Sequence, residues 1–190
     1  MRDILKLGAI LMIYSLVAAG ALAFVNIETI PQIRQNKMDA EDAARAVVLP
    51  GMVGGYELKN EGSDFLYWIG YRDAQKSEPG GYIFITRESG YSSTIEIMVG
   101  VLDDKITGVK ILFQQETPGL GAKTEEVRHG ETEPWFTSQF KEKSASDNIR
   151  VIKDGGGIDS ITGATISSRA VTDAINRGLL ELQRKLGGEL

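Results

Sequence analysis

Two short segments of the chain combine residue types that could bind a charged, flat ligand. The first is residues 159–168, DSITGATISS, in which small and hydroxyl-bearing residues precede the apolar pattern of a C-terminal helix. Free backbone N–H groups and the helix dipole attract an anion to such a start. Gly163 and Ala164 would let a phosphate approach the backbone, and Thr162 and Thr165 offer hydroxyl groups. An ordinary helix N-cap, for which Ser and Thr are also preferred, explains the same spacing.

The second segment is residues 116–123, ETPGLGAK, which directly follows an expected strand. Pro118 and Gly119 fit the two central positions of a type II turn. A rigid turn flanked by Glu116 and Thr117 could hold backbone amides and one carboxylate against a flat ligand. A plain connection from a strand to a helix is the alternative, and the residues alone do not decide between them.

The composition narrows the chemistry that these segments could serve. The chain has 190 residues, no cysteine and one histidine. It therefore has no disulfide, no Cys-type zinc site, no Cys-ligated iron–sulfur cluster and no thiol catalysis. We predict no metal site and no catalytic residue, so redox chemistry would need an organic cofactor. The net charge of −5 and a pI near 5.0 argue against a nucleic-acid partner.

The N-terminus carries a candidate membrane anchor. Residues 4–25 contain a single charge, Lys6, and as a helix they would span about 33 Å, enough for the hydrocarbon core of a bilayer. Arg2 and Lys6 precede the apolar run and place the N-terminus in the cytoplasm, with residues 26–190 on the opposite face. A cleaved signal peptide ending at the Ala-Leu-Ala of residues 21–23 is the alternative that we favour less.

The elements that must position the two segments follow from apolar periodicity. We expect Pro31 to kink or end the first helix, and an amphipathic helix over residues 38–48 to end at residues 49–51. The predicted strands, the third and fourth of which form a hairpin, are 65–71, 82–86, 94–102, 106–114 and 149–152, with Gly80 and Gly81 in the gap before the second.

Two helices complete the predicted domain. Pro134 opens a short helix that includes Trp135, Phe136 and Phe140, and a final helix covers residues 165–186 with one apolar face. Strands and helices without regular alternation predict an α+β fold, here an antiparallel sheet with flanking helices. We divide the chain into an anchor (1–25), a juxtamembrane helix (26–48) and one compact domain (49–190).

Together, the two segments resemble the flavin-binding domain of the G subunit of the Rnf electron-transport complex. The C subunit of the sodium-translocating NADH:quinone reductase shares that domain. The family motif is an Asp, two residues, Ser or Thr, and then Gly-Ala-Thr, which residues 159–165 match at every defined position. The similarity extends over nearly the whole chain, from the single N-terminal anchor to the closing helix.

The resemblance implies covalent FMN, joined by a phosphoester to the hydroxyl of Thr165. It also implies that a separate magnesium-dependent flavin transferase, with FAD as donor, recognises the motif and modifies it. Lys153 lies where the family often has a lysine near the flavin, so a cation favouring the reduced ring is expected there; an exposed loop lysine is the alternative. The resemblance places further contacts to the flavin, its phosphate or the motif loop at Asp159, Ser160, Thr162, Gly163, Ala164, Glu116, Thr117, Gly119 and Leu120.

By the same resemblance, the chain is an electron-carrier subunit of a membrane ferredoxin:NAD oxidoreductase coupled to ion translocation. Its partners would be the other membrane and redox subunits of the complex, and it would not turn over alone. The implied location is the cell (inner) membrane, with a single span and an extracytoplasmic main domain. The alternatives are a C-type subunit of the quinone reductase, a membrane-anchored flavin reductase, and an anchored binding module without flavin.

Overall fold

The computed structural model describes residues 1–59 and 65–187, and the chain forms two compact units, Met1–Glu41 and Asp42–Leu190. Helix α1 (Arg2–Val48) is, among the described residues, the one helix long and apolar enough to cross a membrane. The prediction that the helix could end at Pro31 is wrong, because α1 continues through this residue. A proline removes a single hydrogen bond of the helical ladder, and the helical patterns on both sides outweigh that loss.

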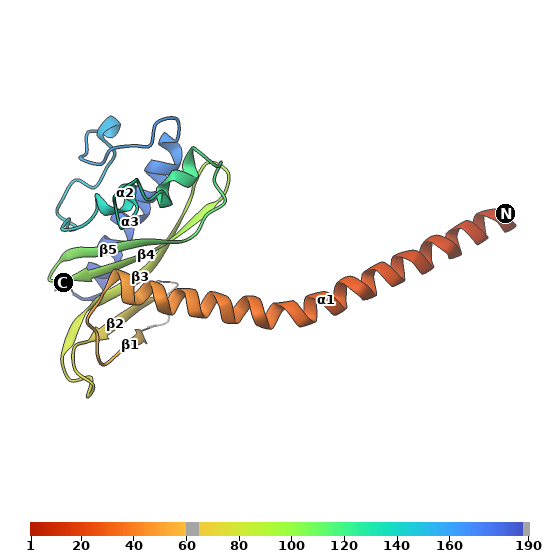
Figure 1. Cartoon of the computed structure of the whole chain (residues 1–190), viewed down its shortest axis with the longest axis horizontal. Coiled ribbons are helices and arrows are strands. Elements are labelled where there is room, and N and C mark those ends of the chain that lie inside the picture. Colours follow the sequence, from red (N-terminus) through yellow and green to blue (C-terminus); the bar gives the residue numbers. More distant parts are fainter. Residues whose placement is uncertain (60–64, 188–190) are drawn as a thin grey trace. The chain divides into compact units, whose positions relative to one another are not determined.

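The second unit is built on one antiparallel sheet in which each strand pairs with the next along the chain (Figure 1). The predicted α+β class and the predicted hairpin are both confirmed. Asp103 and Asp104 turn the hairpin with φ of 50° and 62°, the left-handed pair that a tight two-residue turn requires. The strands are β1 (Tyr56–Lys59), β2 (Tyr67–Tyr71), β3 (Pro79–Ser89), β4 (Thr94–Leu102) and β5 (Lys105–Phe113).

Helix α3 (Thr165–Lys185) packs on one face of this sheet, against β3 and β4. The apolar face predicted from its spacing is confirmed, because Val171, Ile175, Leu179 and Leu182 are fully buried. They share one core with the alternating residues of β4 and with Phe136 and Phe140, which lie in and just after the short helix α2 (Trp135–Ser138). This core fixes the N-terminal end of α3 near the loops that leave β3 and β5.

The last turns of α1 pack on the opposite face of the sheet. Ala44, Val48 and Leu49 form a second core with Trp68, Ile83 and Met98. Helix α1 ends at Val48 as predicted. The hydroxyl of Thr107 on β5 donates to the carbonyl of Val48 at 2.5 Å, which ties the helix end to the edge strand.

Two local predictions are wrong and one strand was not predicted, each for an identifiable reason. Gly80 and Gly81 lie inside β3 rather than before it, because a Cβ on Gly80 would lie 2.7 Å from the Met52 sulfur. Strand β1 was not predicted, since its four residues carry only a weak pattern. The expected strand over 149–152 reduces to a single bridge between Val151 and Ile158, because the chain reverses after the 3-10 helix η2 (Ile152–Asp154).

Candidate functional site

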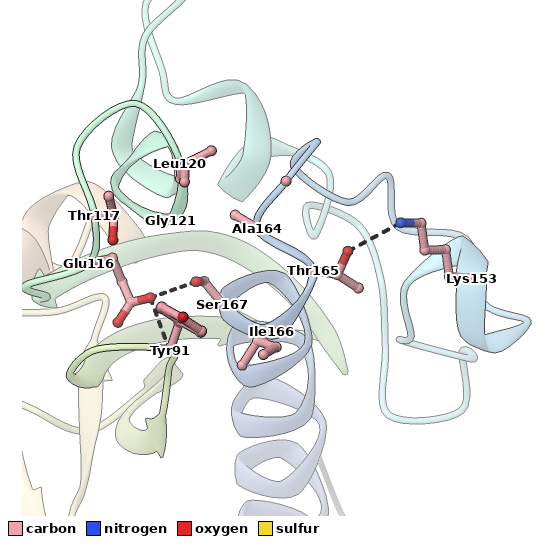
Figure 2. Close-up of a pocket in the computed structure, with 11 residues that line it drawn as sticks. Tyr91, Glu116, Thr117, Leu120, Gly121, Lys153, Ala164, Thr165, Ile166 and Ser167 are labelled. Atoms are coloured by element: carbon pink, nitrogen blue, oxygen red, sulfur yellow. Dashed lines mark hydrogen bonds between the residues drawn. The ribbon is translucent and has the colours of Figure 1, made fainter.

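A cavity of about 470 Å³ lies where the loops after β3 and β5 meet the start of α3 (Figure 2). It brings the two sequence motifs together. Its lining comes from four separate stretches of the chain. The lining residues are Tyr91, Glu116, Thr117, Leu120, Gly121, Lys153, Gly163, Ala164, Thr165, Ile166 and Ser167.

The segment DSITGATISS forms the turn that begins α3. Gly163 has a φ of +79°, a conformation that glycine adopts at little cost, and the Ala164 amide donates to the Ile161 carbonyl at 2.9 Å. The buried Ser168 hydroxyl accepts from the Ile161 amide and donates to the Ala164 carbonyl, both at 3.0 Å. These bonds hold the turn rigidly on the first turn of the helix.

The hydroxyl of Thr165 is not used to cap the helix. The N-cap is Ala164, which makes no side-chain capping bond, and Thr165 is the first helical residue. The explanation of the motif as an ordinary Ser/Thr cap therefore does not hold for this residue. Its hydroxyl instead lies at the cavity, beside backbone N–H groups that the first helical turn leaves without intrahelical partners.

A cation reaches this hydroxyl from another element. Lys153, in η2, donates from Nζ to Oγ1 of Thr165 at 3.2 Å (Figure 2). The resemblance places Lys153 near the flavin, and in the structure its ammonium group contacts the threonine hydroxyl. A cation, a hydroxyl and a helix N-terminus thus converge at one end of the cavity, a combination that favours a phosphate group.

Glu116 forms the floor of the cavity. Its carboxylate is buried and accepts from the Ser167 hydroxyl at 2.6 Å, the Ser93 hydroxyl at 2.9 Å and the amides of Tyr91, Ser92 and Ser93 at 2.9–3.1 Å. Burial alone would raise the pKa of Glu116, but these hydrogen bonds outweigh it and lower the pKa to about 2. The carboxylate is therefore ionised at neutral pH and joins its own loop to the loop after β3 and to the first turn of α3, rather than presenting free oxygens to a ligand.

Glycine makes the close approach of these loops possible. Gly121 begins the 3-10 helix η1 (Gly121–Glu125), and a Cβ there would lie 2.6 Å from the Ser167 hydroxyl oxygen. A Cβ on Gly90 would lie 2.6 Å from a carboxylate oxygen of Glu116. A larger residue at Gly121 would separate the ETPGLG loop from α3, and a larger residue at Gly90 would push the loop after β3 away from Glu116.

The other end of the cavity is apolar. Tyr91, Leu120 and Ile166 are 71%, 42% and 50% exposed, and all three line the cavity. Leu120 is held by the predicted turn at Pro118 and Gly119: its amide donates to the Thr117 carbonyl at 3.1 Å, and Gly119 has a φ of +77°. Exposed apolar side chains gathered at one cavity are typical of a ligand site.

Seven of the eleven residues predicted from the sequence line this cavity, and four do not. Gly119 supports the turn behind Leu120 without lining the cavity. The other three, Asp159, Ser160 and Thr162, line a separate polar hollow on another side of the motif loop, together with Lys123 and Arg128. The backbone of Asp159 is held there by Gln139, whose side chain both donates to it and accepts from it.

Four lining residues lie outside the predicted set: Tyr91, Gly121, Ile166 and Ser167. Gly121 and Ser167 belong to the two motifs, so their glycine and hydroxyl types were a usable signal. Tyr91 lies in the loop between β3 and β4, far from both motifs in the sequence, and only the Glu116 carboxylate brings it to the site. No local pattern marks such a residue.

Known proteins resemble the chain over almost its whole length. It is 33% identical to the G subunit of the Na(+)-translocating ferredoxin:NAD(+) oxidoreductase complex of Acetobacterium woodii, over 94% of this chain and 91% of that protein. It is 31% identical to the G subunit of the ion-translocating oxidoreductase complex of Methanosarcina acetivorans, over 92% of each. The chain belongs to this family of G subunits. The resemblance read from its motifs is thereby confirmed.

Within this member of the G-subunit family, residues 90–180 match the family model described as an FMN-binding domain. All eleven cavity-lining residues lie inside that range. The crystal structure of the C subunit of the Na(+)-translocating NADH-quinone reductase from Parabacteroides distasonis is similar with 25% identity and a TM-score of 0.47, over 60% of this chain and 59% of that one.

The residues present fit FMN on their own chemistry. The cavity volume of about 470 Å³ falls within the range of cofactor sites. One end offers a lysine, a hydroxyl and a helix N-terminus for a phosphate, and the other offers apolar surface for a flat ring. The Glu116 carboxylate is ionised, but its hydrogen-bond donors disperse its charge and it lies on the floor of the cavity, whereas Lys153 and Thr165 lie at the end that favours a phosphate.

Proposed function

We propose that this chain carries FMN joined by a phosphoester to the hydroxyl of Thr165, as an electron-carrier subunit of an ion-translocating ferredoxin:NAD oxidoreductase complex. The observation that carries the proposal is the position of that hydroxyl. It lies at the mouth of the cavity, is not used as a helix cap, and accepts from Lys153.

The chain's own residues would have separate tasks. The backbone amides at the start of α3 and the ammonium group of Lys153 would hold the phosphate. Leu120, Ile166 and Tyr91 would contact the ring and exclude water from part of it. Glu116 would keep the loop of Tyr91 and the first turn of α3 in place. Bound FMN would supply the electron transfer.

Attachment requires a second protein in this proposal. A threonine hydroxyl is a weak nucleophile and needs a base. The one histidine of the chain, His129, does not line the cavity, and no other ordinary base contacts Thr165 in the described part of the chain. A flavin transferase that uses FAD would therefore supply both the base and the activated phosphate.

The role in a complex comes from the relatives together with the anchor. Two relatives are named as subunits of ion-translocating oxidoreductase complexes, and α1 begins with an apolar stretch long enough to span a bilayer. We propose that this chain is anchored by one span, with its N-terminus in the cytoplasm and its FMN domain on the other side. The partners would be the membrane and redox subunits of the same complex.

The deciding experiment compares wild type with Thr165→Ala and Thr165→Ser, each coexpressed with a flavin transferase. Denatured protein is tested for in-gel flavin fluorescence and for its intact mass. We expect the wild type to fluoresce and to gain the mass of one FMN, the alanine variant to do neither, and the serine variant to retain some labelling because it keeps a hydroxyl. An unmodified wild type, beside a control substrate that the transferase does label, contradicts the proposal.

A further inference from the structure

A pair of polar contacts joins η2 to the first turns of α3. One contact is the hydrogen bond from Lys153 to Thr165. The other is an ion pair in which Arg169 donates from Nε and Nη2 to the two carboxylate oxygens of Asp154, each at 2.6 Å. Thr165 and Arg169 are four residues apart and so lie on one face of the helix. Lys153 and Asp154 are neighbours in the sequence, so the two contacts lie side by side between η2 and α3.

The two contacts differ in how firmly they fix the position of η2 relative to α3. A lysine side chain is long and rotates freely, and its ammonium group accepts many orientations. The guanidinium fork of Arg169 meets both oxygens of Asp154 and therefore fixes direction as well as distance. The strength of this contact is also seen in the pKa of Asp154, which the hydrogen bonds from Arg169 lower below its ordinary value.

In the described part of the chain, the other contacts of η2 are with the residues just before and after it in the sequence. Val151 and Ile158 are buried and bridge to each other under the turn, while residues 152–155 are exposed. The turn ends at Gly155 with a φ of +81°, where Asn148 donates to its carbonyl at 2.9 Å. On the side that faces α3, the ion pair with Arg169 is thus the contact that sets how far Lys153 lies from Thr165.

We infer that Asp154 and Arg169 are positioning residues that hold Lys153 at the Thr165 hydroxyl, where its charge assists attachment of the flavin phosphate. This inference rests on the proposed function. In the attachment, the P–O bond between the FMN phosphorus and the AMP portion of FAD breaks, and a bond forms between that phosphorus and Oγ1 of Thr165. AMP leaves with the electron pair of the broken bond, and the proton of Thr165 passes to a base of the transferase.

The charge of Lys153 would act on this step in two ways. The phosphorus carries negative oxygens, and negative charge grows on the groups around it as the new bond forms. A lysine within hydrogen-bond reach of the accepting oxygen stabilises that charge and orients the hydroxyl. Loss of the Asp154–Arg169 pair leaves the charge of Lys153 intact but frees its position, so it should slow attachment less than loss of Lys153 itself.

The test measures the initial rate of labelling of purified full-length protein in detergent, with FAD, Mg²⁺ and a flavin transferase. In-gel fluorescence gives the rate, and intact mass confirms one FMN per chain. We expect Lys153→Met to lower the rate roughly tenfold, the scale of one charged hydrogen bond. Asp154→Asn and Arg169→Gln should each lower it roughly fivefold. Arg184→Gln, which removes an ion pair with Glu181 on the same helix, is the matched control and should label like wild type.

A double-mutant comparison separates positioning from a general structural effect. If the ion pair acts through Lys153, Asp154→Asn should change the rate by less than about twofold in the Lys153→Met background. Equal slowing in both backgrounds, or wild-type labelling of Asp154→Asn and Arg169→Gln, overturns the inference while the proposed function stands. If Arg169→Gln fails to fold, Arg169→Lys replaces it, because lysine keeps the positive charge but cannot contact both oxygens of Asp154. A wild type that is never labelled removes the proposed function and this inference with it.

Discussion

The buried carboxylate of Glu116 makes the stability of the domain depend on pH in a way that one substitution isolates. Hydrogen-bond donors from residues 91–93 and Ser167 surround it, and they lower its pKa from an ordinary value of 4.5 to about 2. A group whose pKa is lower in the folded state stabilises that state above its unfolded pKa. This contribution is lost as the pH falls from about 4.5 towards 2.

The size of the effect follows from the two pKa values. A separation between 4.5 and about 2 corresponds to about 3 kcal/mol of stability at pH 7. At pH 3, which lies between the two pKa values, about 1.5 kcal/mol of this stabilisation remains. Glu116→Gln keeps the size of the side chain and removes the charge. The free energy of unfolding should therefore differ between wild type and the variant by roughly twice as much at pH 7 as at pH 3.

Urea unfolding of the full chain in detergent, followed by the fluorescence of its two tryptophans, measures this difference. Glu131→Gln is the matched control, because Glu131 is exposed and its loss should change stability by at most about 0.5 kcal/mol at either pH. Comparison of each variant with wild type at the same pH cancels the titration of the other carboxylates. A difference for Glu116→Gln that is equal at pH 7 and pH 3 refutes the hydrogen-bond explanation.

Two further predictions concern loop packing and topology. Gly121→Ala should destabilise the domain by about 1–3 kcal/mol in the same unfolding assay, because the new Cβ would lie 2.6 Å from the Ser167 hydroxyl oxygen; Gly157→Ala, where a Cβ meets nothing within 4 Å, should change it by about 0.5 kcal/mol or less. The chain has no cysteine, so a single introduced cysteine reports on which side of the membrane it lies. Glu131→Cys should react with a membrane-impermeant maleimide in cells whose outer barrier is permeabilised and whose inner membrane is intact, whereas Asp3→Cys should react only after lysis. The reverse pattern contradicts the proposed orientation.

The parts of the fold that could be predicted are those that a local pattern determines. Alternation over β4 and β5 and the four-residue spacing of α3 each predict one buried face, and those faces are buried. The alternation did not predict that β4 is also buried on its other face, where Met98 packs against the end of α1. The misplaced glycines show the limit of such patterns. Gly80 and Gly81 are typical of a turn in the sequence, but in the sheet they leave room for Met52 and Leu49, which come from a distant loop.

The candidate site likewise has a part that local sequence patterns predict and a part that depends on the folded chain. The TGAT turn and the ETPGLG turn are local structures, and both motifs reach the cavity. The role of Glu116 could not be predicted, because its partners lie in the loop before β4 and in α3, and only the folded chain brings them to one carboxylate. Lys153 could be noticed in the sequence, but its contact with Thr165 depends on the packing of η2 against α3.

The polar contacts around the cavity differ in what their loss should change. The carboxylate of Glu116 is buried, so removing one of its partners leaves an uncompensated group and should lower stability. The pair of Asp154 and Arg169 is exposed to solvent, where ion pairs contribute little to stability. Variants of Glu116 should therefore lower stability, whereas variants of Asp154 should slow labelling at nearly unchanged stability. The hydrogen bonds of Glu116 thus hold the first turn of α3 in place, while the Asp154–Arg169 pair sets the position of Lys153 at the Thr165 hydroxyl.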